Sequence, residues 1–82
     1  MSNPESGFNP QEYTRLAKQR ALELLKQGDF KSAIDSMVSD LSKDPSRSQE
    51  QKNMIVMMGM ATRNDQALDD KKTREFIEGF AN

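Results

Sequence analysis

Cysteine, histidine and tryptophan are all missing from this chain of 82 residues. Without cysteine, neither disulfide bonds nor thiolate metal sites can form, which agrees with a reducing compartment. Without histidine, the chain lacks the commonest metal ligand and the side chain that usually exchanges protons near neutral pH. These absences leave little room for metal-dependent or histidine-based catalysis.

Long apolar segments and net charge are scarce as well. Hydrophobic residues make up 34% of the chain, and no run of 18 or more apolar residues is present to form a transmembrane helix. The formal net charge is −1, so no overall field favours nucleic acid or an anionic membrane. The first ten residues are polar and contain no apolar signal core, which predicts a cytoplasmic protein.

The chain does contain one dense apolar stretch, Met54–Ala61, which holds four of its six methionines. No charged residue lies between Lys52 and Arg63. One face of a helix here would carry Met54, Met57, Met58 and Ala61. The remaining apolar side chains fall largely on other faces: Ile55, Val56 and Met60. Because a helix that is apolar nearly all round must be covered on more than one side, we expect it to be the central helix of a small bundle.

Two helices are predicted before this stretch. Asn9 as a cap and Pro10 at the first helical position indicate a helix over Pro10–Lys26, and Glu12 fits a capping box. Its apolar stripe is Tyr13, Leu16, Ala17, Ala21, Leu24 and Leu25. Gly28 is a left-handed stop residue, and Asp29 can cap a second helix. The apolar positions of that helix are Phe30, Ala33, Ile34, Met37, Val38 and Leu41.

The short link between these helices predicts an antiparallel αα-hairpin over Pro10–Lys43, closed by Pro45. A third helix is expected over 48–62, with Ser46 or Ser48 as its cap. Gly59 inside that helix costs about 1 kcal/mol relative to alanine, which makes sense if another helix crosses closely.

A fourth helix is expected over 69–80, with Phe76, Ile77 and Phe80 on its apolar face. No strand pattern is present. The sequence therefore predicts an all-α fold, a small four-helix domain with a leading αα-hairpin. We expect residues 1–9 to form a flexible N-terminal arm, with Phe8 docking near the first helix, and residues 10–82 to form a single helical domain.

The hairpin resembles a single tetratricopeptide repeat over residues 13–46. The likeness lies in the run Lys26–Asp35, in the spacing of Ala33 and Pro45, in Met37 at the large apolar position and in Ala21 at the small one. Two residues depart from the family pattern: Arg20 stands where the family prefers leucine, and Asp40 where it prefers alanine. Such units need stacked neighbours for stability, and the segment after Ser46 does not repeat the pattern.

Most of the chain also resembles small uncharacterised helical proteins of tailed phages and prophages. The likeness lies in the stretches 20–23, 28–29, 37–43 and 74–80. It implies a phage origin, with a location in the host cytoplasm, and it carries no known activity.

Candidate reactive groups are few. Asp69 and Asp70 are adjacent, but they open a helix, where negative charge is favoured. Asp40 either lies in solvent or accepts hydrogen bonds from a neighbouring helix. The cluster of Asn64, Asp65, Asp69 and Asp70 does not match the spacing of an EF-hand calcium loop. No residue is predicted to be catalytic, to bind a cofactor or to ligate a metal, so we expect a protein that is not an enzyme.

The methionine-rich helix suggests a different role, because flexible thioethers serve both as core filler and as adaptable contact surface. Its apolar positions exceed what three short helices can cover, which predicts a homodimer seam beside the core. The expected interface residues are Ile55, Val56, Met57, Met60, Phe76 and Phe80. We expect a non-catalytic protein–protein interaction module that binds an unidentified protein. The alternatives are a dimeric nucleic-acid-binding accessory protein and a minor structural or assembly component of a virion.

Overall fold

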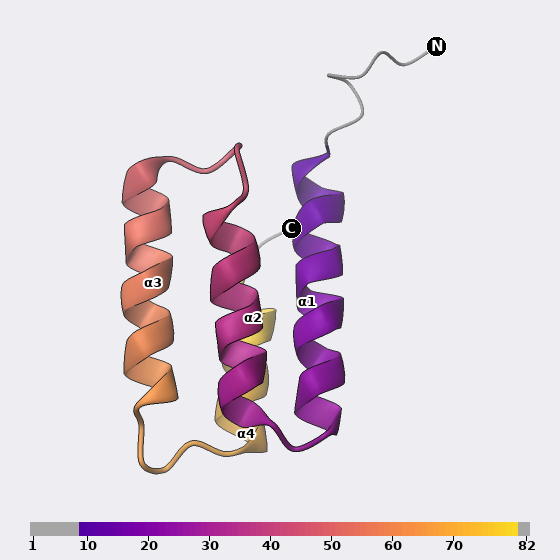
Figure 1. The fold of residues 1–82 in the computed structure, drawn as a ribbon, viewed down its shortest axis with the longest axis vertical. Coiled ribbons are helices and arrows are strands. Elements are labelled where there is room, and N and C mark those ends of the chain that lie inside the picture. The colour runs from indigo at the N-terminus through magenta and orange to yellow at the C-terminus, as the bar shows by residue number, and fades with distance from the viewer. Residues whose placement is uncertain (1–8, 81–82) are drawn as a thin grey trace.

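The computed structural model describes residues 9–80, which form four helices and no strand (Figure 1). The helices are α1 (Pro10–Lys26), α2 (Phe30–Ser42), α3 (Gln49–Arg63) and α4 (Asp70–Glu78). This confirms the all-α, four-helix prediction with its leading hairpin. The predictions for residues 1–8, including the docking of Phe8, and for residues 81–82 lie outside the described residues.

Local side-chain chemistry fixes where α1 begins. The Asn9 carboxamide oxygen accepts hydrogen bonds from the backbone N–H groups of Gln11 and Glu12, at 3.0 and 3.3 Å. The Glu12 carboxylate pairs with the Arg15 guanidinium, which lowers the pKa of Glu12. Asn9 is thus a helix cap, as predicted.

The turn between α1 and α2 depends on one backbone conformation. Gly28 has a φ of +81°, a region in which side chains with a Cβ are strained. The N–H of Gly28 donates to the Leu25 carbonyl and that of Asp29 to the Leu24 carbonyl, which together form a Schellman motif. The Asp29 carboxylate then caps α2 through the Ser32 N–H. The chain therefore reverses within three residues, and α1 and α2 pack closely against each other.

Helix α2, and not α3, is the centre of the fold. Helices α1, α2 and α3 lie side by side in one layer with α2 in the middle, and α4 crosses behind α2 (Figure 1). Helix α2 packs against all three other helices, whereas α3 packs closely only against α2. The prediction that the methionine-rich helix is central is therefore wrong. The buried hydrophobic side chains are Ala17, Ala21, Leu25, Ala33, Ile34, Met37, Leu41, Ile55 and Ile77.

The short length of α4 explains this arrangement. It begins at Asp70, after the Asp69 cap, and ends at Glu78, so it is shorter than the predicted 69–80. Its nine residues pack mainly against α1 and α2 and touch α3 less. No other described helix lies on the outer side of α3, which leaves that side uncovered.

The glycine in α3 marks a close helix crossing, as predicted. A Cβ added at Gly59 would lie 2.3 Å from Cγ2 of Val38 on α2 and 3.7 Å from the Phe76 ring. Only a residue without a side chain leaves room for α2 at this position. The Gly59 side of α3 therefore faces inward, and this orientation fixes which residues face outward.

Candidate interaction surface

The orientation of α3 follows from its caps and its buried side. The Ser48 hydroxyl accepts from the Gln51 N–H, and the Gln51 side chain accepts from the Ser48 N–H, which forms a capping box. Ile55 and Gly59 are the buried residues of the helix. Because residues turn by about 100° each along a helix, Met54, Met57 and Met60 then lie on the far side.

These three methionines are open to solvent. The exposed fraction is 70% for Met57, 62% for Met54 and 58% for Met60. Met58 and Val56 on the two flanks are also exposed, although less so. We call Met54, Met57, Met60 and the neighbouring Ala61 the outer face of α3. The sequence predicts that protein covers this segment on more than one flank, partly through a second copy. The single chain covers one flank closely, because α2 alone packs closely on the segment.

The six predicted interface residues divide into three groups. Val56, Met57 and Met60 lie at the surface, as an interface requires. Ile55 is 4% exposed and belongs to the core, which corrects the prediction for this residue. Phe76 and Phe80 are partly buried against the core and meet edge to face, with ring centroids 5.2 Å apart. The outer face therefore comes from α3 alone, with Phe76 at its margin.

The surface of α3 is hollowed at both ends. One hollow of about 670 Å³ is lined by Ser48, Glu50, Gln51, Asn53, Met54 and Met57. A second, of about 400 Å³, lies between α3 and α4 and is lined by Ala61, Thr62, Asp65, Lys72, Glu75 and Phe76. The outer face thus continues into a hollow at each end, and both hollows also carry polar and charged side chains. Sequence reasoning did not indicate the second hollow, because its shape depends on where α4 lies.

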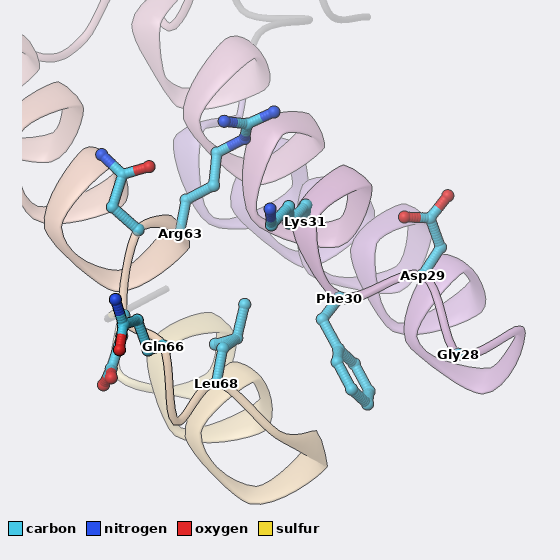
Figure 2. Close-up of a pocket in the computed structure, with 9 residues that line it drawn as sticks. Gly28, Asp29, Phe30, Lys31, Arg63, Gln66 and Leu68 are labelled. Carbon is cyan, nitrogen blue, oxygen red and sulfur yellow. The ribbon is translucent and has the colours of Figure 1, made fainter.

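A third hollow lies between the start of α2 and the link from α3 to α4 (Figure 2). Its volume is about 480 Å³, and Phe30 and Leu68 contribute apolar side chains to it. Arg63 extends away from Leu68 in this view and pairs with Asp35, with Nε 3.0 Å from the carboxylate. Charges of both signs line the hollow, and two of them, Arg63 and Asp65, form ion pairs, so the hollow offers no concentrated charge of one sign for a ligand.

The carboxylates near α4 have structural partners. Asp69 accepts from the Lys72 N–H, and Asp70 pairs with Arg74. The Asp65 carboxylate accepts from the backbone N–H of Ala67 and from the Lys72 ammonium, and these contacts lower the pKa of Asp65. Within residues 9–80, no group of three or more Asp and Glu side chains is placed to hold a metal ion.

The basic side chains are mostly paired as well. All twelve lysines and arginines lie within the described residues, and the seven that form ion pairs there are Arg15, Arg20, Lys26, Arg47, Arg63, Lys72 and Arg74. These pairs spread over all four helices, so seven of the twelve basic side chains already have an acidic partner instead of a phosphate.

One of these pairs joins the two residues that depart from the tetratricopeptide pattern. Arg20 Nε on α1 lies 3.0 Å from Oδ2 of Asp40 on α2. The Tyr13 hydroxyl also donates to the Asp40 carbonyl, at 2.7 Å. Asp40 is therefore largely buried at the contact between α1 and α2, and polar contacts join the hairpin where the repeat family uses apolar residues.

Comparisons with family models, with curated proteins and with solved structures find no match for this chain. The two resemblances described from the sequence therefore stay predictions, and the site rests on the chain's own residues. Among the described residues, no helix is long and apolar enough to cross a membrane.

Proposed function

We propose that this protein is a non-catalytic protein–protein interaction module that binds through the outer face of α3. One observation carries the proposal: the most exposed large hydrophobic side chains of the described chain gather on one helix and face solvent. A contiguous apolar surface on a small soluble domain is typical of a binding site. Methionine suits such a surface because its flexible thioether adapts to the partner's shape.

The size of this surface indicates how strong the binding is. A helix of 15 residues is about 22 Å long and about 10 Å wide, so one face offers less than the roughly 800 Å² that each partner buries in a standard interface. Each fully buried methionine contributes about 1.5–3 kcal/mol, and association itself costs at least about 4 kcal/mol. We therefore propose a transient complex that forms at micromolar or higher concentrations.

Two kinds of partner fit the proposal. A second copy of the chain is the first, because two-fold dimers are the commonest assembly of identical chains. A host protein is the second, and it is supported by the resemblance to phage proteins. The ion pairing of the basic side chains favours both partners over nucleic acid.

Sedimentation velocity of the parent and of Met57→Asp, from a few micromolar to about a millimolar, tests the proposal. Because Met57 is exposed, the variant should keep its helical circular dichroism but lose association. Gln19→Asp is a matched control, since it places the same charge at an exposed position in the middle of α1. If the parent and both variants sediment alike at all concentrations, the outer face does not bind a second copy of the chain.

Binding to nucleic acid is tested in parallel with random-sequence DNA at several salt concentrations. An affinity that falls steeply with salt would favour the nucleic-acid alternative, because such contacts release counterions. Absence of binding at low salt supports the interaction module.

A further inference from the structure

The three methionines of the outer face of α3 are arranged evenly about Met57. Met54 and Met60 stand three residues to either side and are similarly exposed, while Glu50 and Asn64 stand seven residues to either side. Residues spaced by seven fall almost in line along a helix, so Glu50, Met57 and Asn64 follow one edge. The most exposed side chain, Met57, thus marks the midpoint of the face.

We propose that a second copy of the chain occupies this face, with its α3 antiparallel to the first and a two-fold axis at Met57. The inference rests on the proposed function and names the partner and its orientation. In this arrangement Met57 packs against Met57 of the partner subunit. Glu50 lies near Asn64 of the partner subunit, whose carboxamide can donate a hydrogen bond to the carboxylate.

The charge pattern favours a second copy in this orientation. No charged residue lies between Lys52 and Arg63, so two copies of the face meet without like charges at their centre. A parallel arrangement would set Glu50 against Glu50 of the partner subunit, and like charges in an interface repel. The antiparallel arrangement separates the two carboxylates and also opposes the two helix dipoles.

The fold leaves room for the second copy. Helix α3 lies at the edge of the layer formed by α1, α2 and α3, so a partner α3 would extend the layer outward (Figure 1). The buried residues Ile55 and Gly59 keep their contacts with α2. Each copy uses the same surface, so the assembly closes as a dimer and does not grow into a filament.

Single cysteines test this arrangement cleanly, because the chain has none of its own. Met57→Cys, Glu50→Cys and Asn64→Cys each change an exposed residue. With oxidised glutathione and about 100 µM protein, we expect Met57→Cys to form a covalent dimer at least tenfold faster than Gln19→Cys, which reports random collisions. Each of the variants Glu50→Cys and Asn64→Cys, tested alone, should form a covalent dimer at about the background rate. In the antiparallel dimer of either variant, 14 residues of helix separate the two identical thiols by about 21 Å. A mixture of the two variants should cross-link quickly.

A second measurement needs no substitution. In the parent labelled with ¹³C at the methionine methyl groups, the signals of Met54, Met57 and Met60 should shift with concentration. The signal of Met37, which is fully buried, should stay in place.

The outcomes separate the two proposals. Rapid self-linking of Glu50→Cys and Asn64→Cys, as fast as that of Met57→Cys, would overturn the antiparallel arrangement. If Met57→Cys links no faster than Gln19→Cys while sedimentation shows an association that Met57→Asp abolishes, the geometry is wrong and the proposed function stands. Methionine signals that do not change up to a millimolar would overturn the second copy as the occupant.

Discussion

At the scale of single residues, Gly59 has the sharpest steric constraint. Alanine there would improve helix propensity by about 1 kcal/mol. However, its Cβ would lie 2.3 Å from Cγ2 of Val38, a short and stiff side chain that has little freedom to move away. Overpacking of this kind costs about 1–3 kcal/mol. We expect Gly59→Ala to lower the free energy of unfolding in urea by up to about 2 kcal/mol.

A second substitution shows whether Val38 is the cause. Val38→Ala removes the clashing atom. It should therefore lower the free energy of unfolding less in the Gly59→Ala variant than in the parent. A double-mutant cycle measures that difference, because the two residues are in contact. A Gly59→Ala variant as stable as the parent would mean that α2 and α3 do not approach each other as closely as described.

Tyr13 provides a test at high pH. Burial first, and then the negative charges of Asp40 and Asp44, raise the pKa of Tyr13 above its ordinary value of 10.0. The folded state therefore holds the phenol proton more tightly than the unfolded state does. This contribution to stability is complete below pH 10 and is lost as the pH rises towards the higher, folded pKa.

We expect Tyr13→Phe to lower the free energy of unfolding by about 1 kcal/mol at neutral pH, because the hydrogen bond to the Asp40 carbonyl disappears. Above pH 10 the stability of the parent should fall towards that of the variant, which has no phenol to titrate. Urea unfolding of both proteins between pH 7 and 11 measures the difference. A difference that stays constant over this range would refute the assigned pKa shift.

At the scale of elements, Asp44 holds the connection from α2 to α3. Its carboxylate is buried and accepts from the Ser46 N–H at 2.9 Å and from the Ser46 hydroxyl at 2.7 Å. The Arg47 Nε lies 3.4 Å from its other oxygen. Because this turn carries the chain into α3, Asp44 helps to decide how the outer face is presented.

Removal of this carboxylate should therefore be costly. We expect Asp44→Ala to lower the free energy of unfolding by about 2–3 kcal/mol, since both Ser46 donors lose their acceptor and the buried Arg47 Nε loses its ion-pair partner. Asp44→Asn retains one oxygen and should lose about half as much. Asp35→Asn breaks an exposed ion pair with Arg63 and should cost less than about 1 kcal/mol. Urea titrations rank the three, and an Asp44→Ala variant no weaker than Asp35→Asn would show that the turn does not depend on this carboxylate.

The elements themselves could be predicted because their signals are local. Asn9, Gly28 and Asp29 each act on backbone groups within a few residues and are found at the helix ends as predicted. Of the two predicted caps of the third helix, Ser46 and Ser48, the structure uses Ser48. The length of α4 was overestimated because the apolar Phe80 continues the helical spacing beyond Gly79, where the helix stops. Propensity and spacing describe one helix at a time, and they do not indicate which helix packs in the middle.

At the scale of the whole molecule, the candidate surface was only half predictable. The sequence predicts Met54, Met57, Met58 and Ala61 on one helical face and Met60 on another. In the structure Met60 lies with Met54, Met57 and Ala61 on the outer face, and Met58 lies on its flank. Whether that face is core or surface depends on α4, which packs mainly on α1 and α2. Ile55 is predicted at the interface but lies in the core, because the spacing of apolar residues does not distinguish one that faces inward from one that faces outward. The assignment of the face required the packing of all four helices.

The exposed thioethers predict that the proposed association is sensitive to oxidation. Hydrogen peroxide transfers one oxygen atom to a methionine sulfur and leaves water, which turns an apolar side chain into a polar sulfoxide. Met54, Met57 and Met60 are open to solvent, whereas Met37 is fully buried in the core. Mild peroxide should therefore oxidise the outer face first and leave the fold intact.

We expect peroxide-treated protein to keep its helical circular dichroism and to sediment as a monomer where the untreated protein associates. Methionine sulfoxide reductases should restore the association, because the modification is reversible. The matched control is a variant with leucine at positions 54, 57 and 60, which keeps an apolar face that peroxide does not modify. Its association should survive the same treatment. If Met37 is oxidised as fast as Met57, or if the leucine variant loses association equally, the effect does not arise at the outer face.

Peptide mass spectrometry at each time point measures the oxidation of each methionine and distinguishes these cases. Slower oxidation of Met57 at high protein concentration would show directly that association covers this residue.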